Sequence, residues 1–434
     1  MTTPTNVRTW FGSGTGVAVR SYVRSKEHAL FLIAAAVIFV HLLTQAFIDP
    51  APMSRASDNI VTGLSGPALV ALLAVSYPKL AIGFRAAATL LLGFFAVISG
   101  AIIHISQMVA VETTLSDVTA VASIAAGIVL VGMGLWLAWK AMPHIALKLA
   151  IIPAVPVSIV WLIFPLALAT FIVNTPRVPL GDETPADYGL AYETVAFDNS
   201  DGDTLKGWYV PSGNGAAVIL LHGAGKNRIR TLEYADIFAR HGYGVLLFDR
   251  RGYGESEGSP NVFGWTGAGD VDAAVEFLDG RPDVDDGRIG ALGLSVGGEI
   301  ALNAIGENDG IGAVISEGAG IHVWSEYKQM PNKGIGEHIF GVSMFNAYTA
   351  IYALSGDEQP PSNLDLIQDV DRPILLISTG SGEEGEWNDL LMDEAGPNVD
   401  LWETGGGHIH GLDEKPVEYE QRVTDFLDKA FFEE

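Results

Sequence analysis

The sequence carries one serine whose neighbours suit nucleophilic chemistry, in the stretch Ile289-Gly-Ala-Leu-Gly-Leu-Ser-Val-Gly-Gly. Ser295 completes the pattern Gly-x-Ser-x-Gly with Gly293 and Gly297. The apolar run before the serine and the helical spacing after it predict a strand, a one-residue corner and a helix from Val296 onward. Such a corner exposes the hydroxyl at the end of a sheet and turns the first helical N–H groups towards developing negative charge. A glycine-rich turn with an incidental serine is the alternative, so catalytic partners must be sought elsewhere in the chain.

A second glycine-rich turn, Leu221-His-Gly-Ala-Gly-Lys-Asn-Arg, follows an apolar run. Its backbone N–H groups can face a substrate oxygen, and we expect the N–H groups of Ala224 and Val296 to form a two-donor oxyanion hole. Loss of one such donor typically raises a barrier by about 3 kcal/mol. A tight turn with no catalytic role is the alternative. The pattern G-x-x-x-x-G-K-[ST] of a phosphate-binding loop is absent.

A base for the serine is expected late in the chain, because the order Ser, acid, His is one of those used by serine triads. His408 follows three glycines in the stretch Glu403-Thr-Gly-Gly-Gly-His. A histidine on such a loop can reach over the serine and accept its proton, so we assign His408 as the base. His410 is the alternative.

The acid of the triad is expected between the serine and the histidine, after the apolar run 374–378. Four carboxylates compete for this position, and for any one of them a solvated acidic loop is the simpler interpretation. We prefer Glu383, which stands three residues after Gly380 and so falls in the first turn of the loop. The alternatives are Glu384, Glu386 and Asp389.

Charge divides the chain into two unlike parts. Residues 1–175 hold 9 Lys and Arg against 5 Asp and Glu, whereas residues 176–434 hold 16 against 46. The acidic part repels nucleic acid, so no nucleic-acid partner is expected. The chain has no cysteine, which excludes disulfides, thiolate catalysis and cysteine-based metal sites. No metal and no cofactor is expected.

The N-terminal part is predicted to be a transmembrane domain of about five helices. A bilayer core of about 30 Å needs about 20 apolar residues per helix, and four of the five stretches reach that length. The second stretch is the weakest, because it is short and contains Pro67. The five apolar stretches are 29–48, 60–77, 85–107, 118–139 and 149–173.

Basic residues predict the orientation of these helices, since cytoplasmic connections carry the excess of Lys and Arg. Basic residues alternate with acidic ones from one connection to the next, and the basic side is always that of the N-terminus. Five crossings then place the acidic part outside the cytoplasm of a cell membrane. The residues behind this orientation are Arg8, Arg20, Arg24, Lys26, Lys79, Arg85, Lys140 and Lys148 on the basic side, and Asp49, Arg55, Asp58, Glu112 and Asp117 on the other.

The acidic part alternates apolar strands with helical segments after a linker rich in Pro, Asp and Thr. Such alternation predicts an α/β domain with a mostly parallel sheet, whose sites lie at the carboxyl ends of the strands. Asp249 and Arg250 at one of these ends are expected to be structural. The predicted strands are 192–197, 204–210, 216–221, 244–248, 289–294, 312–316, 374–378 and 398–402, and the predicted helices are 230–240, 268–278, 296–305, 385–394 and 416–431.

The strand-end motifs together resemble those of the α/β-hydrolase family, over about residues 185–432. The motifs are HGAGKNR from His222, DRRGYGES from Asp249, GLSVGG from Gly293 and GGGHIHG from Gly405. The resemblance implies that Ser295 is the nucleophile, His408 the base, and Ala224 and Val296 the oxyanion donors. Family members commonly carry HG-x-x-D where this chain has Thr-Gly-Ser-Gly-Glu, so the resemblance leaves the acid open.

Residues 321–365 fall where such folds insert a lid, and the segment is rich in aromatic residues and methionine. It is expected either to form a wall for an acyl group or to cover the core. The predicted organisation is therefore a multi-pass transmembrane domain over 1–175, a linker over 176–190, and an α/β-hydrolase domain over 191–434 with its lid.

The function that this organisation favours is a membrane-anchored serine hydrolase cleaving carboxylic esters through an acyl-enzyme. Its expected partners are a small-molecule or lipid ester and membrane lipid. Three alternatives stay open: an acyltransferase acting on envelope lipid or glycan, a serine peptidase, and a non-catalytic receptor on a hydrolase fold.

Overall fold

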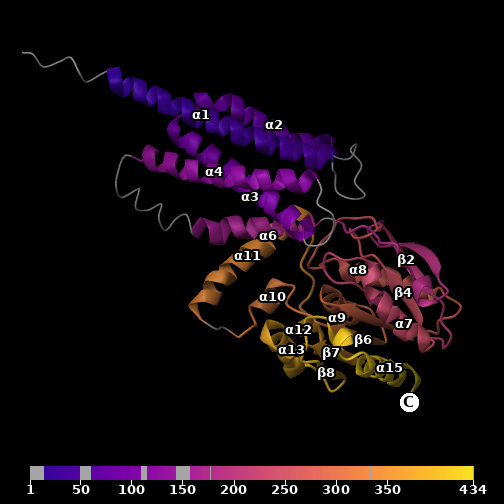
Figure 1. The fold of residues 1–434 in the computed structure, drawn as a ribbon. Coiled ribbons are helices and arrows are strands. Elements are labelled where there is room, and N and C mark those ends of the chain that lie inside the picture. The colour runs from indigo at the N-terminus through magenta and orange to yellow at the C-terminus, as the bar shows by residue number, and fades with distance from the viewer. Residues whose placement is uncertain are drawn as a thin grey trace, which may run out of the picture. The chain divides into compact units, whose positions relative to one another are not determined.

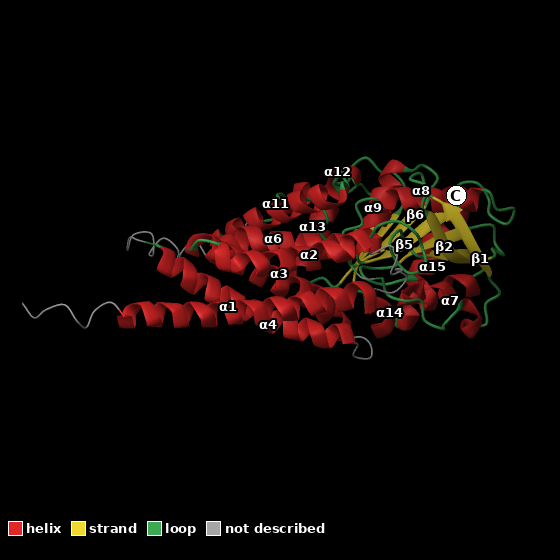
Figure 2. Cartoon of the chain, turned by 90° about the horizontal axis from the view of Figure 1, so that it is seen from above, coloured by secondary structure: helices red, strands yellow, loops and turns green. Residues whose placement is uncertain are grey.

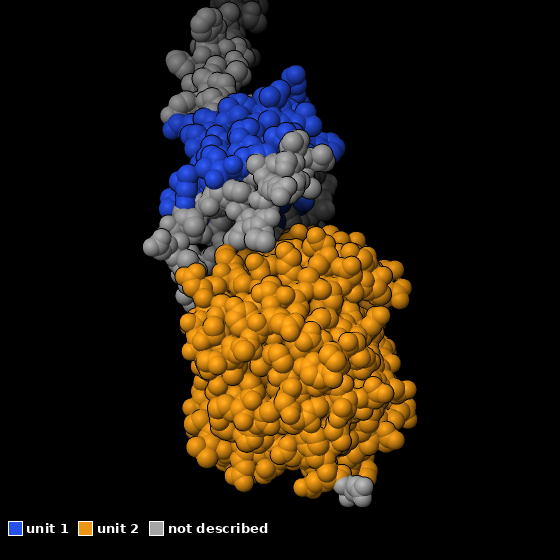
Figure 3. Space-filling view, turned by 90° about the vertical axis from the view of Figure 1, so that its right-hand side faces the viewer, with its two compact units in different colours: residues 1–156 blue, residues 157–434 orange. Residues whose placement is uncertain are grey.

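The computed structural model describes residues 14–48, 60–108, 115–142, 157–175, 177–331 and 334–433. The chain forms two compact units, residues 1–156 and 157–434, coloured separately in Figure 3. Several predictions fall outside the described residues: part of the fifth apolar stretch (149–156), part of the lid (332–333), and Arg8, Asp49, Arg55, Asp58, Glu112 and Lys148.

The first unit is helical. Helices α3 and α4 cross closely, because a Cβ added to Gly93 would lie 2.9 Å from the carbonyl oxygen of Gly127. Small residues let two apolar helices approach in this way. The elements are α1 (Gly14–Leu43), η1 (Thr44–Ile48), α2 (Ile60–Ser76), η2 (Tyr77–Lys79), α3 (Ile82–Met108) and α4 (Leu115–Ala141).

The prediction of five membrane-crossing helices is not supported. Among the described residues, two helical segments are long and apolar enough to cross a membrane: Lys26–Leu43 in α1 and Val118–Ala141 in α4. The apolar part of α3 is shorter, at Ile82–Val97, and so is Ile159–Val173. Helix α2 has 17 residues and is interrupted by Pro67. Helix α3 as a whole extends from Ile82 to Met108, so apolar composition predicts more crossings than the two segments found among the described residues.

The second unit begins before the predicted linker. Its first helical segments are η3 (Ile159–Ile163) and α6 (Phe164–Val173), the described part of the fifth apolar stretch. A short turn, η4 (Pro185–Tyr188), precedes the first strand. The unit boundary at residue 156 lies before the predicted domain boundary at 175, because α6 packs against a helix of the second unit.

The second unit is organised around one eight-stranded sheet in the order β1-β2-β4-β3-β5-β6-β7-β8. Only β2 runs against its two neighbours, and all other neighbouring pairs are parallel. All eight strands lie within two residues of their predicted positions. They are β1 (Glu193–Asp198), β2 (Thr204–Val210), β3 (Ala217–Leu221), β4 (Gly244–Phe248), β5 (Ile289–Leu294), β6 (Ala313–Glu317), β7 (Ile374–Ser378) and β8 (Val399–Glu403).

Helices cover both faces of the sheet (Figure 2). Helices α7 (Leu232–Arg240) and α15 (Pro416–Phe432) pack on one face, and their apolar side chains join one buried cluster. Helices α8 (Gly267–Asp279), α9 (Val296–Glu307) and α13 (Gly382–Glu394) contribute to the cluster on the other face. The central strands are buried on both sides, which explains why they read as continuous apolar runs.

The predicted lid forms three helices between β6 and β7. They are α10 (Trp324–Tyr327), α11 (Ile335–Ser355) and α12 (Asn363–Leu366). Helix α11 lies beside α6 in both ribbon views (Figure 1). Side chains of both helices join one small buried cluster with Trp265 and Val323. The aromatic residues of this segment therefore do two things, since some fill a core and others stay exposed.

Candidate active site

The sharp turn at Ser295 is present as predicted. Strand β5 ends at Leu294, helix α9 begins at Val296, and Ser295 has φ 54° and ψ −123°. A Cβ added to Gly293 would lie 2.0 Å from the carbonyl oxygen of Gly297, and one added to Gly297 would lie 2.3 Å from that of Leu221. Glycine is therefore needed on both sides of the serine for steric reasons.

We expect Gly297→Ala to abolish folding of the second unit or to destabilise it by at least about 3 kcal/mol, because the added methyl meets rigid backbone. The matched control is Gly336→Ala in α11, where nothing lies within 4 Å of the added Cβ. That variant is expected to be unchanged or up to about 1 kcal/mol more stable. Urea denaturation of the detergent-solubilised chain measures both. Equal stability of the two variants would contradict the steric account.

The structure brings Ser295 and His408 together with one of the predicted carboxylates. His408 Nδ1 lies 2.6 Å from Oε2 of Glu384, and His408 Nε2 lies 3.0 Å from Oγ of Ser295. An ionised carboxylate only accepts hydrogen bonds. Nδ1 of His408 therefore carries the ring proton and donates a hydrogen bond to Glu384. Nε2 is then left as the acceptor for the serine hydroxyl. This is the hydrogen-bond order that a serine–histidine–acid triad requires.

The hydrogen bond between His408 and Glu384 shifts the pKa of both groups. The hydrogen bond to Glu384 raises the pKa of His408 above its usual value, against the effect of partial burial. Burial alone would raise the pKa of Glu384, but hydrogen bonds from His408, the Thr379 N–H and the Ser378 hydroxyl lower it below its usual value. The carboxylate is thus held ionised beside the imidazole, where it favours the imidazolium that forms when the serine is deprotonated.

The carboxylate at His408 is Glu384, not the preferred Glu383. Helix α13 begins at Gly382, which places both residues in its first turn but about 100° apart. Glu384 lies on the same helix face as the buried Asn388, whose amide donates to the Glu384 carbonyl at 2.8 Å. Glu383 points elsewhere and is exposed. Of the other two alternatives, Glu386 lines the nearby cavity and Asp389 is exposed.

The loop that carries His408 is held in a strained conformation. Among the described residues, Ser295 and Ile409 are the two non-glycine residues with positive φ, and they lie next to the same hydrogen bond. Strained residues of this kind cluster at active sites. His410, the alternative base, is turned away: its Nδ1 lies 3.1 Å from Asp413.

Sequence analysis missed two residues that position His408. Gly318 leaves room for the ring, since a Cβ there would lie 2.9 Å from Cε1 of His408. Glu317 ends β6 and is buried; its carboxylate accepts from the Gly411 N–H at 3.0 Å and from the Tyr419 hydroxyl at 2.7 Å, and its carbonyl accepts from the Ser295 N–H at 2.7 Å. A buried acid at a strand end is the signal that would have found Glu317.

The predicted oxyanion donors lie on either side of the serine. A Cβ added to Gly223 would lie 3.5 Å from Cβ of Ser295, so the turn that contains Ala224 runs directly against the elbow. Val296 is the first residue of α9, and the first N–H groups of a helix have no acceptor within it. These positions are compatible with the predicted oxyanion hole, and the roles of Ala224 and Val296 as donors stay a prediction.

A buried histidine fixes the oxyanion turn rather than taking part in proton transfer. The Arg250 N–H donates to His222 Nε2 at 3.2 Å, so Nδ1 carries the proton and donates to the Gly223 carbonyl at 2.9 Å. Complete burial, with the nearby Arg250 guanidinium, lowers the pKa of His222 to about 3. The imidazole is therefore neutral at every physiological pH, and its two hydrogen bonds connect the two loops.

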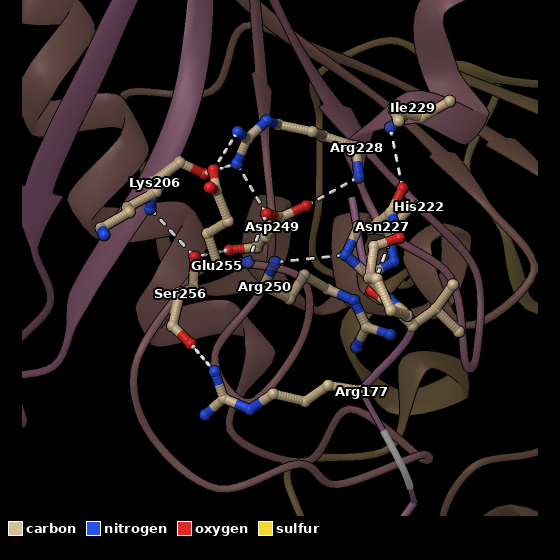
Figure 4. Close-up of polar contacts among 12 residues, drawn as sticks. Arg177, Lys206, His222, Asn227, Arg228, Ile229, Asp249, Arg250, Glu255 and Ser256 are labelled. Atoms are coloured by element: carbon tan, nitrogen blue, oxygen red, sulfur yellow. Dashed lines mark hydrogen bonds and ion pairs between the residues drawn. The ribbon is translucent and has the colours of Figure 1, made fainter. Parts of the chain in front are cut away.

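The same two loops are tied together by a buried ion pair, shown in Figure 4. Arg228 Nη1 lies 2.6 Å from Oδ2 of Asp249, and the Arg228 N–H donates to Oδ1 at 2.8 Å. The Glu255 N–H also donates to Asp249, at 2.9 Å, and the Glu255 carboxylate pairs with Arg228. The structural role predicted for Asp249 is confirmed by these contacts.

Replacing Asp249 with alanine is expected to destabilise the second unit by about 3 kcal/mol, because Arg228 then stays buried with only the partly exposed Glu255 as counter-charge and two backbone N–H groups lose their acceptor. Glu418→Ala is the matched control. It breaks the exposed pair between Glu418 and Arg422 in α15, which is worth only about 0.3–0.5 kcal/mol. Urea denaturation of both full-length variants checks the difference, and similar midpoints would refute the assigned role.

A cavity of about 560 Å³ lies between the lid and α13. Its wall includes the aromatic residues Trp324, Tyr327, Phe340 and Phe345, together with the charged residues Lys328 and Glu337. On the α13 side, Glu383 and Glu386 line the cavity, and Glu384 lies between them in the chain. The aromatic part of the cavity can receive an apolar group, and the lining does not include Ser295 or His408.

Part of the second unit matches a known family. Residues 213–349 match the family model described as serine aminopeptidase, S33 (Hydrolase_4). This region runs from just before β3 into α11, so it contains the oxyanion turn, the elbow and most of the lid.

Sequence relatives cover the same half of the chain. Protein Rv2307c of Mycobacterium tuberculosis H37Rv is 32% identical over 194 residues, which are 44% of this chain and 61% of that protein. YfhR of Escherichia coli K12 is 31% identical over 172 residues, 36% of this chain and 59% of that protein. The chain thus spans about three-fifths of these relatives. The thiohydrolase aneE of Aspergillus aculeatus is 38% identical over 117 residues, 26% of this chain and 37% of that protein.

Solved structures of similar proteins include an esterase, Pf2001 of Pyrococcus furiosus. It is 26% identical with a TM-score of 0.48, and the match covers 59% of this chain and 99% of that one. The α/β hydrolase GrgF of a Penicillium species is 21% identical with a TM-score of 0.43, over 56% of this chain and 99% of that one.

The family match agrees with what the second unit shows by itself. An eight-stranded and mostly parallel sheet carries a serine on a strained strand-to-helix turn, with a histidine after the last strand. The second unit thus has a sheet and a strained serine turn of the kind found in α/β hydrolases, and its residues 213–349 match a hydrolase family model.

Proposed function

We propose that the second unit is a serine esterase that forms an acyl-enzyme on Ser295. The observation that carries this proposal is the continuous line of hydrogen bonds from Ser295 through His408 to Glu384. A serine hydroxyl is a weak nucleophile unless a positioned base removes its proton, and a third group must orient that base. All three groups are within hydrogen-bond distance here.

Acylation then follows from the geometry. Ser295 Oγ attacks the ester carbonyl carbon while His408 Nε2 takes the hydroxyl proton, and Glu384 stabilises the imidazolium. The carbonyl oxygen becomes negative in the tetrahedral intermediate and accepts hydrogen bonds from the N–H groups of Ala224 and Val296. The bond to the alcohol oxygen breaks, and His408 returns its proton to that oxygen. Deacylation repeats these steps with water as the nucleophile, releasing the acid and restoring Ser295.

The cavity beside α13 supports an apolar acyl group as the substrate's main binding element. Four aromatic side chains line it, and an apolar group gains about 25 cal/mol per Å² of surface removed from water. The acidic residues at its α13 side disfavour a second carboxylate on the substrate. We therefore propose neutral esters with medium or long acyl chains.

The apolar helices of the first unit support a membrane location for this esterase. Two described segments, in α1 and α4, can cross a bilayer. We propose that the chain is anchored in the cell membrane by these and further apolar segments. Basic residues before the first apolar stretch favour a cytoplasmic N-terminus, and an odd number of crossings, as in the five predicted from sequence, would place the acidic catalytic domain outside the cytoplasm.

Hydrolysis of p-nitrophenyl esters of increasing acyl length by the detergent-solubilised full chain tests the proposal. We expect kcat/KM to rise from acetyl to octanoyl as the acyl chain fills the cavity. Phe345→Ala should flatten this rise without changing the rate on the acetyl ester. Activity on none of the esters would overturn the proposal, and a rate independent of chain length would overturn the role given to the cavity.

Amide cleavage is a second candidate, because the matching family is described as a serine aminopeptidase. Aminoacyl p-nitroanilides tested beside the esters decide between them. The ratio of the enzyme's kcat/KM for the ester to that for the amide is compared with the ratio of their rates of hydrolysis by hydroxide. An enzymatic ratio well above the hydroxide ratio supports the esterase. Adding an alcohol acceptor and analysing the products then separates hydrolysis from acyl transfer, which uses the same acyl-enzyme.

A further inference from the structure

Helix α11 of the lid forms a pair with η3 and α6. The Trp161 indole N–H donates to the Ile339 carbonyl at 3.0 Å, and the Asn346 amide donates to the Trp161 carbonyl at 2.7 Å. The rings of Phe164 and Phe340 lie 6.3 Å apart between centroids. Side chains on each side of the pair thus donate hydrogen bonds to backbone carbonyl groups on the other side. Both sides belong to the second unit.

The outward surface of this pair is apolar. On α11, Val342, Phe345 and Tyr352 follow one another at intervals of three and seven residues, so they share one helix face, and all are exposed. On the other helix, Ile159, Leu162 and Leu166 recur at intervals of three and four residues and are exposed as well. We call these six residues the apolar face.

Charge is missing from both helices over a long distance. Residues 157–173 contain no Asp, Glu, Lys or Arg, and neither do residues 339–355. The rest of the second unit is strongly acidic, since residues 176–434 hold 46 acidic and 16 basic residues. Exposed apolar patches of this kind mark interaction sites. A charged occupant would find no opposite charge among the six residues of this face.

The apolar face is also continuous with the cavity. Val342 and Phe345 belong to the face and line the cavity beside Glu383 and Glu386. Trp161 and Tyr352, on the two helices, are of the residue types that settle at the boundary between lipid and water. We propose that the apolar face is immersed in the acyl-chain region of a lipid bilayer, so that the lid opens towards lipid and not towards water.

The chain offers a clean test, because it contains no cysteine. Phe345→Cys, Val342→Cys and Leu162→Cys each introduce a single labelling site at positions exposed by 49%, 44% and 64%. Val417→Cys is the matched control: it is an apolar residue of α15, 80% exposed, next to the charged Glu418. Each full-length variant is labelled with the fluorophore NBD and reconstituted into phosphatidylcholine vesicles with or without doxyl-labelled acyl chains.

We expect doxyl lipid to quench the labels of the apolar face several-fold more strongly than the label at 417, and iodide in the water to quench them several-fold less. Iodide quenching equal to that of the control would show that the face lies in water and would overturn the proposal. Protection from both quenchers would overturn it too, because the face would then be covered by protein. The measurement needs no turnover, so it is independent of the proposed esterase activity.

Discussion

Ser295→Ala is expected to lower kcat/KM for p-nitrophenyl octanoate by roughly 10⁵-fold or more, because no other group can form the acyl-enzyme. The variant should fold normally. The serine hydroxyl has one contact, at 3.0 Å to His408, so its removal leaves no buried polar atom in the core. Binding of the substrate in the cavity should also persist, so KM is expected to change much less than kcat.

A control variant distinguishes loss of the nucleophile from loss of folding. Ser316→Ala removes another hydroxyl from the end of a neighbouring strand, where its side chain lies against the first turn of α9. We expect this variant to keep most of its activity. If Ser295→Ala retained more than about a hundredth of the activity while remaining pure and folded, the assignment of the nucleophile would fail.

Glu384→Gln is expected to lower kcat by about 10³- to 10⁴-fold, because a neutral amide neither stabilises the imidazolium nor enforces the tautomer with its proton on Nδ1. The adjacent Glu383→Gln is the matched control. It removes the same charge one residue away, but Glu383 makes no contact with His408 in the structure. We expect little change in kcat for that variant. The opposite order of effects would return the acid to the residue preferred from sequence.

The pH profile gives a second readout of the same contact. His408 must be neutral to accept the proton, so kcat/KM falls as the pH drops below the pKa of His408. Glu384 raises that pKa, chiefly through its hydrogen bond to Nδ1. Glu384→Gln should therefore move the acid limb of the profile to lower pH while reducing the maximum. A limb that stays in place would contradict the contact, even if the activity falls.

The sheet was predictable because its signals are local. A strand buried on both faces must be apolar at every position, and β3, β4 and β5 all satisfy this. The elbow was equally predictable, since Gly293 and Gly297 flank Ser295 in a local sequence pattern, although the backbone contact that requires Gly297 is with the distant Leu221. The chain order of serine, acid and histidine then indicated that the base should follow late in the chain, and His408 lies beside Ser295.

The acid could not be chosen from sequence, because the choice depends on where α13 begins. Shifting the helix start by one residue would rotate both side chains by about 100° and turn Glu383 into the direction that Glu384 now takes. The supporting roles of Gly318 and Glu317 were missed for a related reason. Both act on the His408 loop across almost a hundred residues, through contacts that no local spacing records.

The apolar N-terminal part shows the limit of composition in another way. Stretches of similar hydropathy form different structures. Helices α1 and α4 contain segments that are long enough to cross a bilayer, whereas α6 ends at Val173 and packs against α11 of the lid. An apolar helix that packs against another element on one side and an apolar helix in lipid have the same residue types. Only the partner distinguishes them, and for α6 that partner lies about 170 residues later in the chain.

The most direct test of the central claim is to locate the adduct of a fluorophosphonate on the intact chain. Such a reagent phosphonylates a serine only where a base activates the hydroxyl and an oxyanion hole stabilises the reaction. Mass spectrometry is expected to find one phosphonyl group per chain, on the peptide that contains Ser295, and none after His408→Ala. No adduct on the folded protein, or an adduct on a different residue, would contradict the account.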